Sequence, residues 1–316
     1  MTTNTTTTTL TGRRACSAAA AFAAFLFFWA LLLPTPAPAQ NAPQNAQNGA
    51  ASRGLLWEVR GQGCTAWLLG SVHEADESIY PLSTTIENVY RRADVLAVEA
   101  DVTAPLSPEA QAILESAVYP EGQSLDDDIP QEQQRDLAEH GIDLSPFRHM
   151  RPWFAIMAAM QGRLAEMGLR PDLGIDLHFL ERAHGQGKPV VELEGMARQL
   201  RDIQSLVEMD YKGFVHYTLQ DLDRLEEDLS VFLKAWKTGD EALMEERLFM
   251  DLRADPGLRP FFEKLFFERN VGMARKVEGY LASGRDHLVV VGSGHLVGER
   301  SVVDLLRRAG YDVRRL

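Results

Sequence analysis

The sequence predicts an α/β fold of α+β-like layout, in which a mixed sheet formed by the N- and C-terminal segments carries a helical middle lobe. Apolar runs of strand length occur near both ends of residues 54–316, and apolar residues at helical spacing fill much of the region between them. The last six residues are again strand-like. Because a C-terminal strand can complete a sheet begun at the N-terminus, we expect one domain over residues 54–316.

The first 39 residues are expected to lie outside this domain, as a signal peptide or a membrane anchor. Arg13 and Arg14 precede an alanine-rich apolar run, and Ala37-Pro38-Ala39 supplies the small residues of a cleavage site. An apolar run of this length can also span a bilayer, so cleavage and anchoring both stay open. Residues 40–53 have the Asn, Gln, Ala and Pro content of a flexible linker. We therefore expect an exported protein of the periplasm or cell envelope.

The folded part is acidic. The chain has 45 Asp and Glu residues against 32 Lys and Arg, a formal net charge of -13, and the expected leader contributes no carboxylates to it. Phosphate groups would be repelled by such a surface, which disfavours nucleic acid as a partner. A peptide or another small substrate is expected, and the charge favours a neutral or cationic substrate only weakly. The oligomeric state stays open.

The first half of the domain combines strands and helices. LLWEVR at residues 55–60 and CTAWLLGSV at 64–72 predict two strands, which Gly61-Gln62-Gly63 joins in a hairpin turn. Residues 82–92 have the pattern of a helix, and DVLAVEADV at 94–102 has the length of a buried strand that ends in carboxylates. Three further helices are predicted at residues 105–116, 131–140 and 152–167, and the last has a proline in its first turn.

The second half is mainly helical. A helix over residues 176–185 precedes a strand over 188–194, KPVVELE, which again finishes on carboxylates. Residues 196–284 have a helical pattern almost throughout and are expected to form the lobe over the sheet. Three elements close the chain: a strand at 287–294, HLVVVGSG, a helix at 298–309 and a strand at 311–316.

Two of the predicted strands have nearly the same ending. LLGSVH ends at His73 and VVGSGH ends at His295, more than two hundred residues later. The glycines, Gly70 and Gly292, let the backbone turn sharply without a clash at Cβ. Ligand sites of open α/β sheets lie at the carboxyl ends of the strands, so both histidines are expected to face one crevice. Glu99 ends a third strand in the same way.

Two histidines and one carboxylate form a ligand set for a divalent ion. His73, Glu99 and His295 are therefore the predicted metal ligands, and positions left open around the ion would take water for metal-assisted hydrolysis. Either histidine could instead act as a general base that Glu99 orients. The zinc motif H-E-x-x-H is absent from the sequence.

Four more residues could serve this crevice. Asp176 opens a predicted helix, where capping the helix is the alternative role. Glu192 and Glu194 alternate on one predicted strand and so point to opposite faces, and Glu194 lies nearer the edge. Arg269 and Asn270 lie in a helical run, where a surface salt bridge is the alternative. An arginine aimed at the crevice could hold a carboxylate or stabilise developing negative charge.

At these residues the chain resembles the TraB/GumN family, which is related to the Tiki-type metalloproteases and more distantly to the erythromycin esterase and ChaN-like proteins. The resemblance covers nearly all of residues 54–316. It rests on these segments, taken in order: LLGSVH with the following YPL, VLAVEAD, RPW, GID, VELEG, ERN and VVVGSGHLVGERSVVDLLRRAGYDV.

The resemblance implies two G-x-x-H motifs, ending at His73 and His295, with Glu99 as their acidic partner. It also implies roles for four further residues: Arg269, Asn270, Asp176 and Glu194. Its Tiki-type members imply proteolysis that depends on manganese or cobalt-like ions, and manganese, cobalt and zinc are the candidate ions here. Other members of the family have no agreed reaction.

The leading hypothesis is a metal-dependent, peptidase-like hydrolase of the cell envelope. One alternative is a protein without turnover that holds haem or a similar ligand through a strand-end histidine, as the ChaN-like resemblance permits. A haem site would need an open apolar pocket and no second histidine, so the paired histidines favour the enzyme. The other alternative is an accessory protein of polysaccharide biosynthesis or export, in which the histidines are structural.

Overall fold

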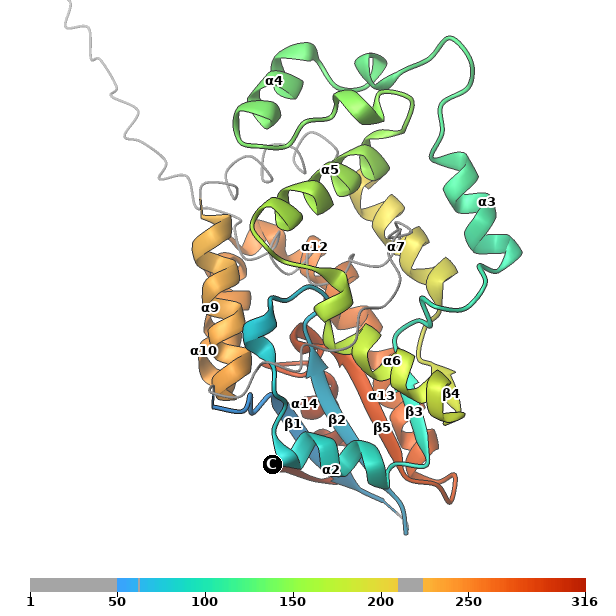
Figure 1. Cartoon of the computed structure of the whole chain (residues 1–316), viewed down its shortest axis with the longest axis vertical. Coiled ribbons are helices and arrows are strands. Elements are labelled where there is room, and N and C mark those ends of the chain that lie inside the picture. The colour runs from blue at the N-terminus through green and yellow to red at the C-terminus, as the bar shows by residue number, and fades with distance from the viewer. Residues whose placement is uncertain (1–49, 62, 210–223) are drawn as a thin grey trace, which may run out of the picture.

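The computed structural model describes residues 50–61, 63–209 and 224–316 (Figure 1). The predicted leader, residues 1–39, and most of the predicted linker lie outside the described residues. Ser52 belongs to the fold, although the linker was predicted to run to residue 53. It is buried, its amide donates to the Pro81 carbonyl at 2.9 Å, and its carbonyl accepts from the Ser83 amide at 2.9 Å. The folded part therefore begins before Gly54.

The described strands form one mixed sheet with the order β4-β3-β5-β2-β1-β6. Its members are β1 (Leu55–Arg60), β2 (Thr65–Ser71), β3 (Val95–Val98), β4 (Val190–Glu192), β5 (His287–Gly292) and β6 (Asp312–Arg315). Strands β4, β3, β5 and β2 are parallel, whereas β1 is antiparallel to both β2 and β6. The predicted α/β fold is thus confirmed, since the last strand pairs with the first.

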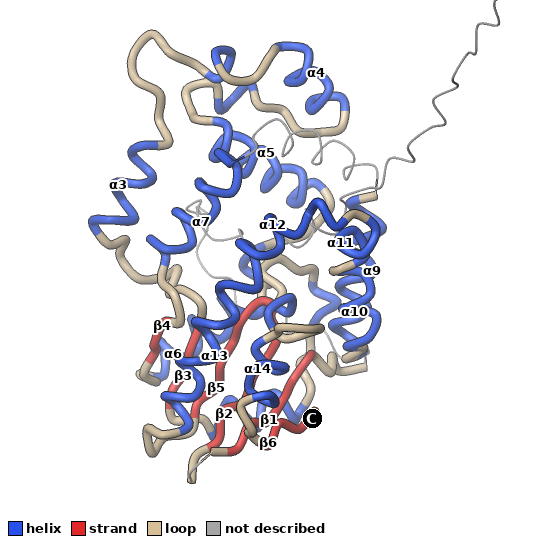
Figure 2. The backbone as a smooth tube through the Cα atoms, turned by 180° about the vertical axis from the view of Figure 1, so that it is seen from behind, coloured by secondary structure: helices blue, strands red, loops and turns tan. Residues whose placement is uncertain are grey.

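Helices cover both faces of the sheet. Helices α2 (Thr84–Arg92) and α6 (Ile175–Gln186) lie on one face, and α13 (Glu268–Leu281) and α14 (Val302–Arg308) lie on the other (Figures 1 and 2). Strand β5, the apolar run of the C-terminal motif, is buried along its whole length. A continuous apolar run is what a parallel strand covered on both faces requires.

The remaining helices extend beyond the carboxyl ends of the parallel strands and along one side of the molecule (Figure 1). They are α3 (Pro108–Ser116), α4 (Gln131–Glu139), α5 (Pro152–Glu166), α7 (Met196–Met209), α9 (Leu225–Thr238), α10 (Glu241–Leu248), α11 (Met250–Ala254) and α12 (Arg259–Phe262). The helical lobe predicted at about residues 196–284 leaves out α3, α4 and α5, which precede β4 in the sequence. None of the described helices combines the length and apolar character that a membrane crossing needs.

Two predicted strands are shorter than expected, and this places the acidic residues past their ends. Strand β3 stops at Val98, just before Glu99, and β4 stops at Glu192, so the prediction that Glu194 lies within a strand is wrong. The amides of Glu194 and Gly195 both donate to the Glu99 carbonyl at 2.9 Å. Two consecutive amides cannot bond one carbonyl in a regular ladder, and the chain therefore turns here.

Gly174, at the N-terminus of α6, fixes this helix to the end of β2. A Cβ on Gly174 would lie 2.1 Å from the carbonyl oxygen of His73, and the Ile175 amide donates to the Val72 carbonyl at 2.9 Å. We predict that Gly174→Ala lowers the free energy of unfolding by about 1–3 kcal/mol, because the backbone must shift.

The measurement is urea unfolding. Gly185→Ala in the same helix is the matched control, since a Cβ there meets nothing within 4 Å. Because alanine has the higher helix propensity, the control should keep or gain stability, by up to about 1 kcal/mol. Equal stability of the two variants would contradict the packing argument.

Candidate functional site

The two motif histidines follow adjacent parallel strands. Strands β2 and β5 pair so that Ser71 lies opposite Gly292, and β5 leads directly into a short 3₁₀ turn, Ser293–His295. The Ser293 hydroxyl donates to the Ser71 carbonyl at 2.8 Å, which ties the two strand ends together. Both imidazoles are buried, at 4% exposure for His73 and 1% for His295. The strand pairing therefore brings both histidines to the same edge of the sheet.

Asp176 orients the ring of His73. Its Oδ2 lies 2.6 Å from His73 Nδ1, and both side chains are buried. Helix α6 is capped at Gly174, so the capping role considered for Asp176 is wrong. Because a carboxylate accepts at Nδ1, that nitrogen carries a proton, and Nε2 is the ring nitrogen turned toward the site. Burial lowers the pKa of His73, but Asp176 and Glu99 together raise it above its usual value.

Asn270 on α13 orients His295 in the same manner. Asn270 Oδ1 lies 2.6 Å from His295 Nδ1, and its Nδ2 donates to the Arg300 carbonyl at 2.9 Å, which sets the direction of the amide. His295 Nε2 therefore faces Glu99, 3.9 Å from Oε1. Burial lowers the pKa of His295 well below its usual value, and the charges of Arg269 and His73 lower it further.

Glu99 is held by three donors in the described part of the chain. The Gly292 amide donates to Oε1 at 2.6 Å, while Gln199 Nε2 at 3.0 Å and an Arg269 nitrogen at 2.8 Å donate to Oε2. Burial raises the pKa of Glu99, and the charges of Arg269 and His73 oppose that shift. The sequence prediction missed Gln199, because one glutamine in a helical run has no pattern that marks it.

Arg269 lies inside the molecule, at 1% exposure, so the surface salt bridge considered for it is wrong. Its guanidinium bonds Glu99 and both carboxylate oxygens of Glu194, and Nε lies 3.0 Å from each of the two Glu194 oxygens. It also donates to the Leu265 carbonyl at 3.1 Å, within a π-helical turn, Glu263–Phe267. Such turns often occur at functional sites. The two carboxylates offset the buried positive charge.

Gly292 leaves space at the centre of the site. A Cβ there would lie 3.3 Å from Glu99 Oε1, 3.5 Å from His73 Nε2 and 3.7 Å from His295 Cδ2. The structure thus brings together all the residues singled out in the sequence as one network: His73, Asp176, Glu99, Glu194, Arg269, Asn270 and His295. Their roles in a reaction stay predictions.

The donor atoms fit a divalent ion in chemical type. Imidazole nitrogens and carboxylate oxygens are the usual ligands of such ions. A bond to Nδ1, which both histidines have, is the usual outer contact of a histidine ligand. The distances between these side chains do not form a metal site: among residues 50–61, 63–209 and 224–316, no group of three or more His, Cys, Asp or Glu side chains is arranged to hold a metal ion. In this arrangement Glu99 binds Arg269 and the Gly292 amide. Metal binding at the site is therefore a proposal.

Comparison with known proteins assigns the chain to a family. The TraB/PrgY/gumN family model matches residues 55–315. The chain belongs to the TraB/PrgY/gumN family. The uncharacterized protein YbaP of Escherichia coli (strain K12) is 30% identical over 76% of this chain and 87% of YbaP. Metalloprotease TIKI2 of Xenopus tropicalis is 22% identical over 82% of this chain and 59% of TIKI2. No solved structure matches. The family predicted from the motifs is thus confirmed.

Glu74, next to His73, is a buried acid that the sequence prediction also missed. Burial raises its pKa to about 8, against smaller opposing effects of Gln161 and His73. The folded chain therefore holds a proton that the unfolded chain releases above the ordinary pKa of 4.5. The contribution of this proton to stability is full below that pH and is lost as the pH rises toward 8.

We predict that Glu74→Gln, which has no proton to lose, removes part of this fall. The check is urea unfolding of both chains at several pH values between 4.5 and 8. The free energy of unfolding of the variant should decline less with pH than that of the native chain. Parallel pH profiles for the two chains would rule out a raised pKa of Glu74.

Proposed function

We propose that this protein is a metal-dependent hydrolase of the cell envelope that cleaves peptide bonds. The observation that carries the proposal is the convergence of His73, Glu99 and His295 around Gly292. The similarity to a protein named as a metalloprotease supports peptide hydrolysis. The envelope location rests on the leader predicted for residues 1–39.

His73, Glu99 and His295 would hold the ion, for which manganese, cobalt and zinc are the candidates. The bound ion would lower the pKa of water and polarise a carbonyl group. Asp176 and Asn270 keep the two imidazole rings turned so that Nε2 faces the site.

Arg269 and Glu194 are positioning residues in this proposal. Arg269 binds Glu99 Oε2 and so fixes the carboxylate plane, while Glu194 offsets the charge of Arg269. In this proposal, the charge of the guanidinium would also stabilise negative charge that develops on a substrate oxygen.

The same geometry favours the enzyme over the haem-like binding alternative. A haem pocket needs an open apolar cavity and one axial histidine, whereas His73 and His295 are both buried beside a charged network. In the alternative of an accessory protein of polysaccharide export, the two histidines would have only a structural role. Metal analysis distinguishes it from the enzyme.

The purified full chain is expected to bind a divalent ion and to cleave a mixed library of blocked peptides when manganese is added. His73→Ala and His295→Ala should each lose bound metal and reduce cleavage by about 100-fold or more, since both remove a ligand. Metal is measured by elemental analysis and cleavage by mass spectrometry.

His149→Ala, at an exposed histidine, is the control and should behave as the native chain. Circular dichroism confirms that the variants fold. Bound metal retained in both site variants would remove the proposal, as would a native chain that neither binds metal nor cleaves peptides.

Gly292→Ala tests the central space without removing any ligand. A methyl group there enters the space between Glu99 and His73, so we expect roughly tenfold or greater loss of cleavage with the fold retained. Gly272→Ala is the control, because a Cβ at that position meets nothing within 4 Å. Native activity of the Gly292 variant would show that this space takes no part in the reaction.

A further inference from the structure

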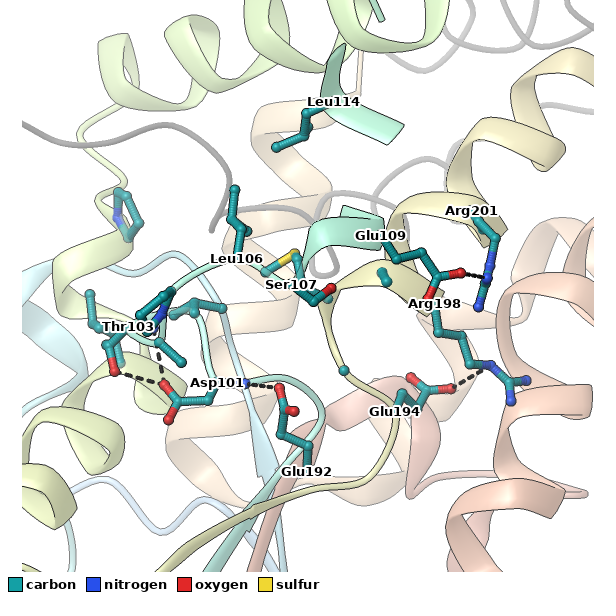
Figure 3. Close-up of a pocket in the computed structure, with 18 of the residues that line it drawn as sticks. Asp101, Thr103, Leu106, Ser107, Glu109, Leu114, Glu192, Glu194, Arg198 and Arg201 are labelled. Atoms are coloured by element: carbon teal, nitrogen blue, oxygen red, sulfur yellow. Dashed lines mark hydrogen bonds and ion pairs between the residues drawn. The ribbon is translucent and has the colours of Figure 1, made fainter. Parts of the chain in front are cut away.

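A cavity of about 650 Å³ lies beside the site, at the carboxyl ends of β3 and β4 (Figure 3). Five segments line it: the loop after β3 at residues 101–107, parts of α3, the short turn at residues 171–172, parts of α6, and the segment from β4 into α7. This volume is sufficient for an extended side chain and part of the backbone that carries it.

The cavity adjoins the candidate site through side chains that belong to both. Glu194 lines the cavity, and its carboxylate bonds Arg269, which also bonds Glu99. Leu177 in the cavity wall directly follows Asp176 in α6. A peptide bound at the site would therefore lie next to this cavity.

Part of the cavity wall is apolar. Leu106 is 46% exposed, which is high for leucine, and it faces the cavity together with Val102, Leu114, Leu177 and Met196. An aliphatic chain lying along this wall would remove apolar surface from water. The wall thus favours a ligand with methylene groups.

The rest of the lining is strongly acidic. It contains six carboxylates, Asp101, Glu109, Asp172, Glu181, Glu192 and Glu194, against two guanidinium groups, Arg198 and Arg201. Both arginines are already paired within the lining, Arg201 with Glu109 and Arg198 with Glu194.

Two of these carboxylates are left for a ligand. In the described part of the chain neither Glu181 nor Glu192 forms an ion pair with a cationic side chain. Glu192 Oε1 accepts from the Asp101 amide at 2.7 Å, which fixes its position at the strand end (Figure 3).

We propose that this cavity is a subsite for a lysine or arginine side chain of the peptide substrate. Its methylene groups would lie against Leu106, Leu177 and Met196, and its cationic head would reach the excess carboxylates. The inference rests on the proposed function, because that proposal makes the ligand a peptide substrate. Binding of the peptide can be measured without its cleavage.

The test measures binding, by titration calorimetry of the full chain with two blocked peptides. One is Ala-Ala-Leu-Lys-Ala-Ala and the other has Gln in place of Lys. We expect the Lys peptide to bind roughly fivefold tighter or more, and the preference to shrink with added salt. The double variant Glu181→Gln, Glu192→Gln should lose the preference.

The matched control is Glu121→Gln with Glu139→Gln, two exposed carboxylates outside the cavity lining, and it should keep the preference. Equal affinity for both peptides, or a preference that survives in the cavity variant, would overturn the inference. Cleavage without a Lys preference would leave the proposed function standing and this subsite rejected. A Lys preference without cleavage would do the reverse.

Discussion

The buried positive charge of Arg269 is the constraint that organises the site. A guanidinium removed from water is costly unless opposite charges and acceptors surround it closely. Glu99 and Glu194 supply those charges from the ends of β3 and β4, and Arg269 supplies the cation from α13. One ion cluster therefore locks two strand ends against a helix that lies far away in the sequence, and it holds Glu99 in a single orientation.

The sheet order explains why the histidines meet this carboxylate. Strand β5 lies between β3 and β2, so the turn that carries His295 is flanked by Glu99 on one side and His73 on the other. Gly292, the last residue of β5, contributes twice: its amide donates to Glu99, and its missing Cβ leaves the space that the three side chains surround. Gly292 thus connects the strand order to the arrangement of the three side chains.

Local pattern predicted the parts of this arrangement that depend on strands and their ends. The buried runs, the glycines that end them and the ordered motifs were enough for the α/β fold, the family and the strand-end histidines. The residue pattern named Asp176 and Arg269 only as candidates with alternative roles, and it gave no sign of Gln199, because long-range packing decides their contacts. Asp176 contacts His73 across more than a hundred residues, Arg269 is buried by carboxylates from two strands, and Gln199 is marked only by its bond to Glu99. Such contacts exist only after the helices dock.

The charge balance of the site connects the two proposals. At its centre Glu99 and Glu194 bond the Arg269 guanidinium, Asp176 bonds His73 and raises its pKa, and the burial of His295 favours its neutral form. In the proposed function, a metal ion would be the further cation at the Nε2 atoms of the two oriented imidazoles. The adjoining cavity has its own excess of carboxylates, and its apolar wall would suit the flexible organic cation of the second proposal. Under the two proposals, the same acidic surroundings would thus select two different cations according to the donors that each location offers.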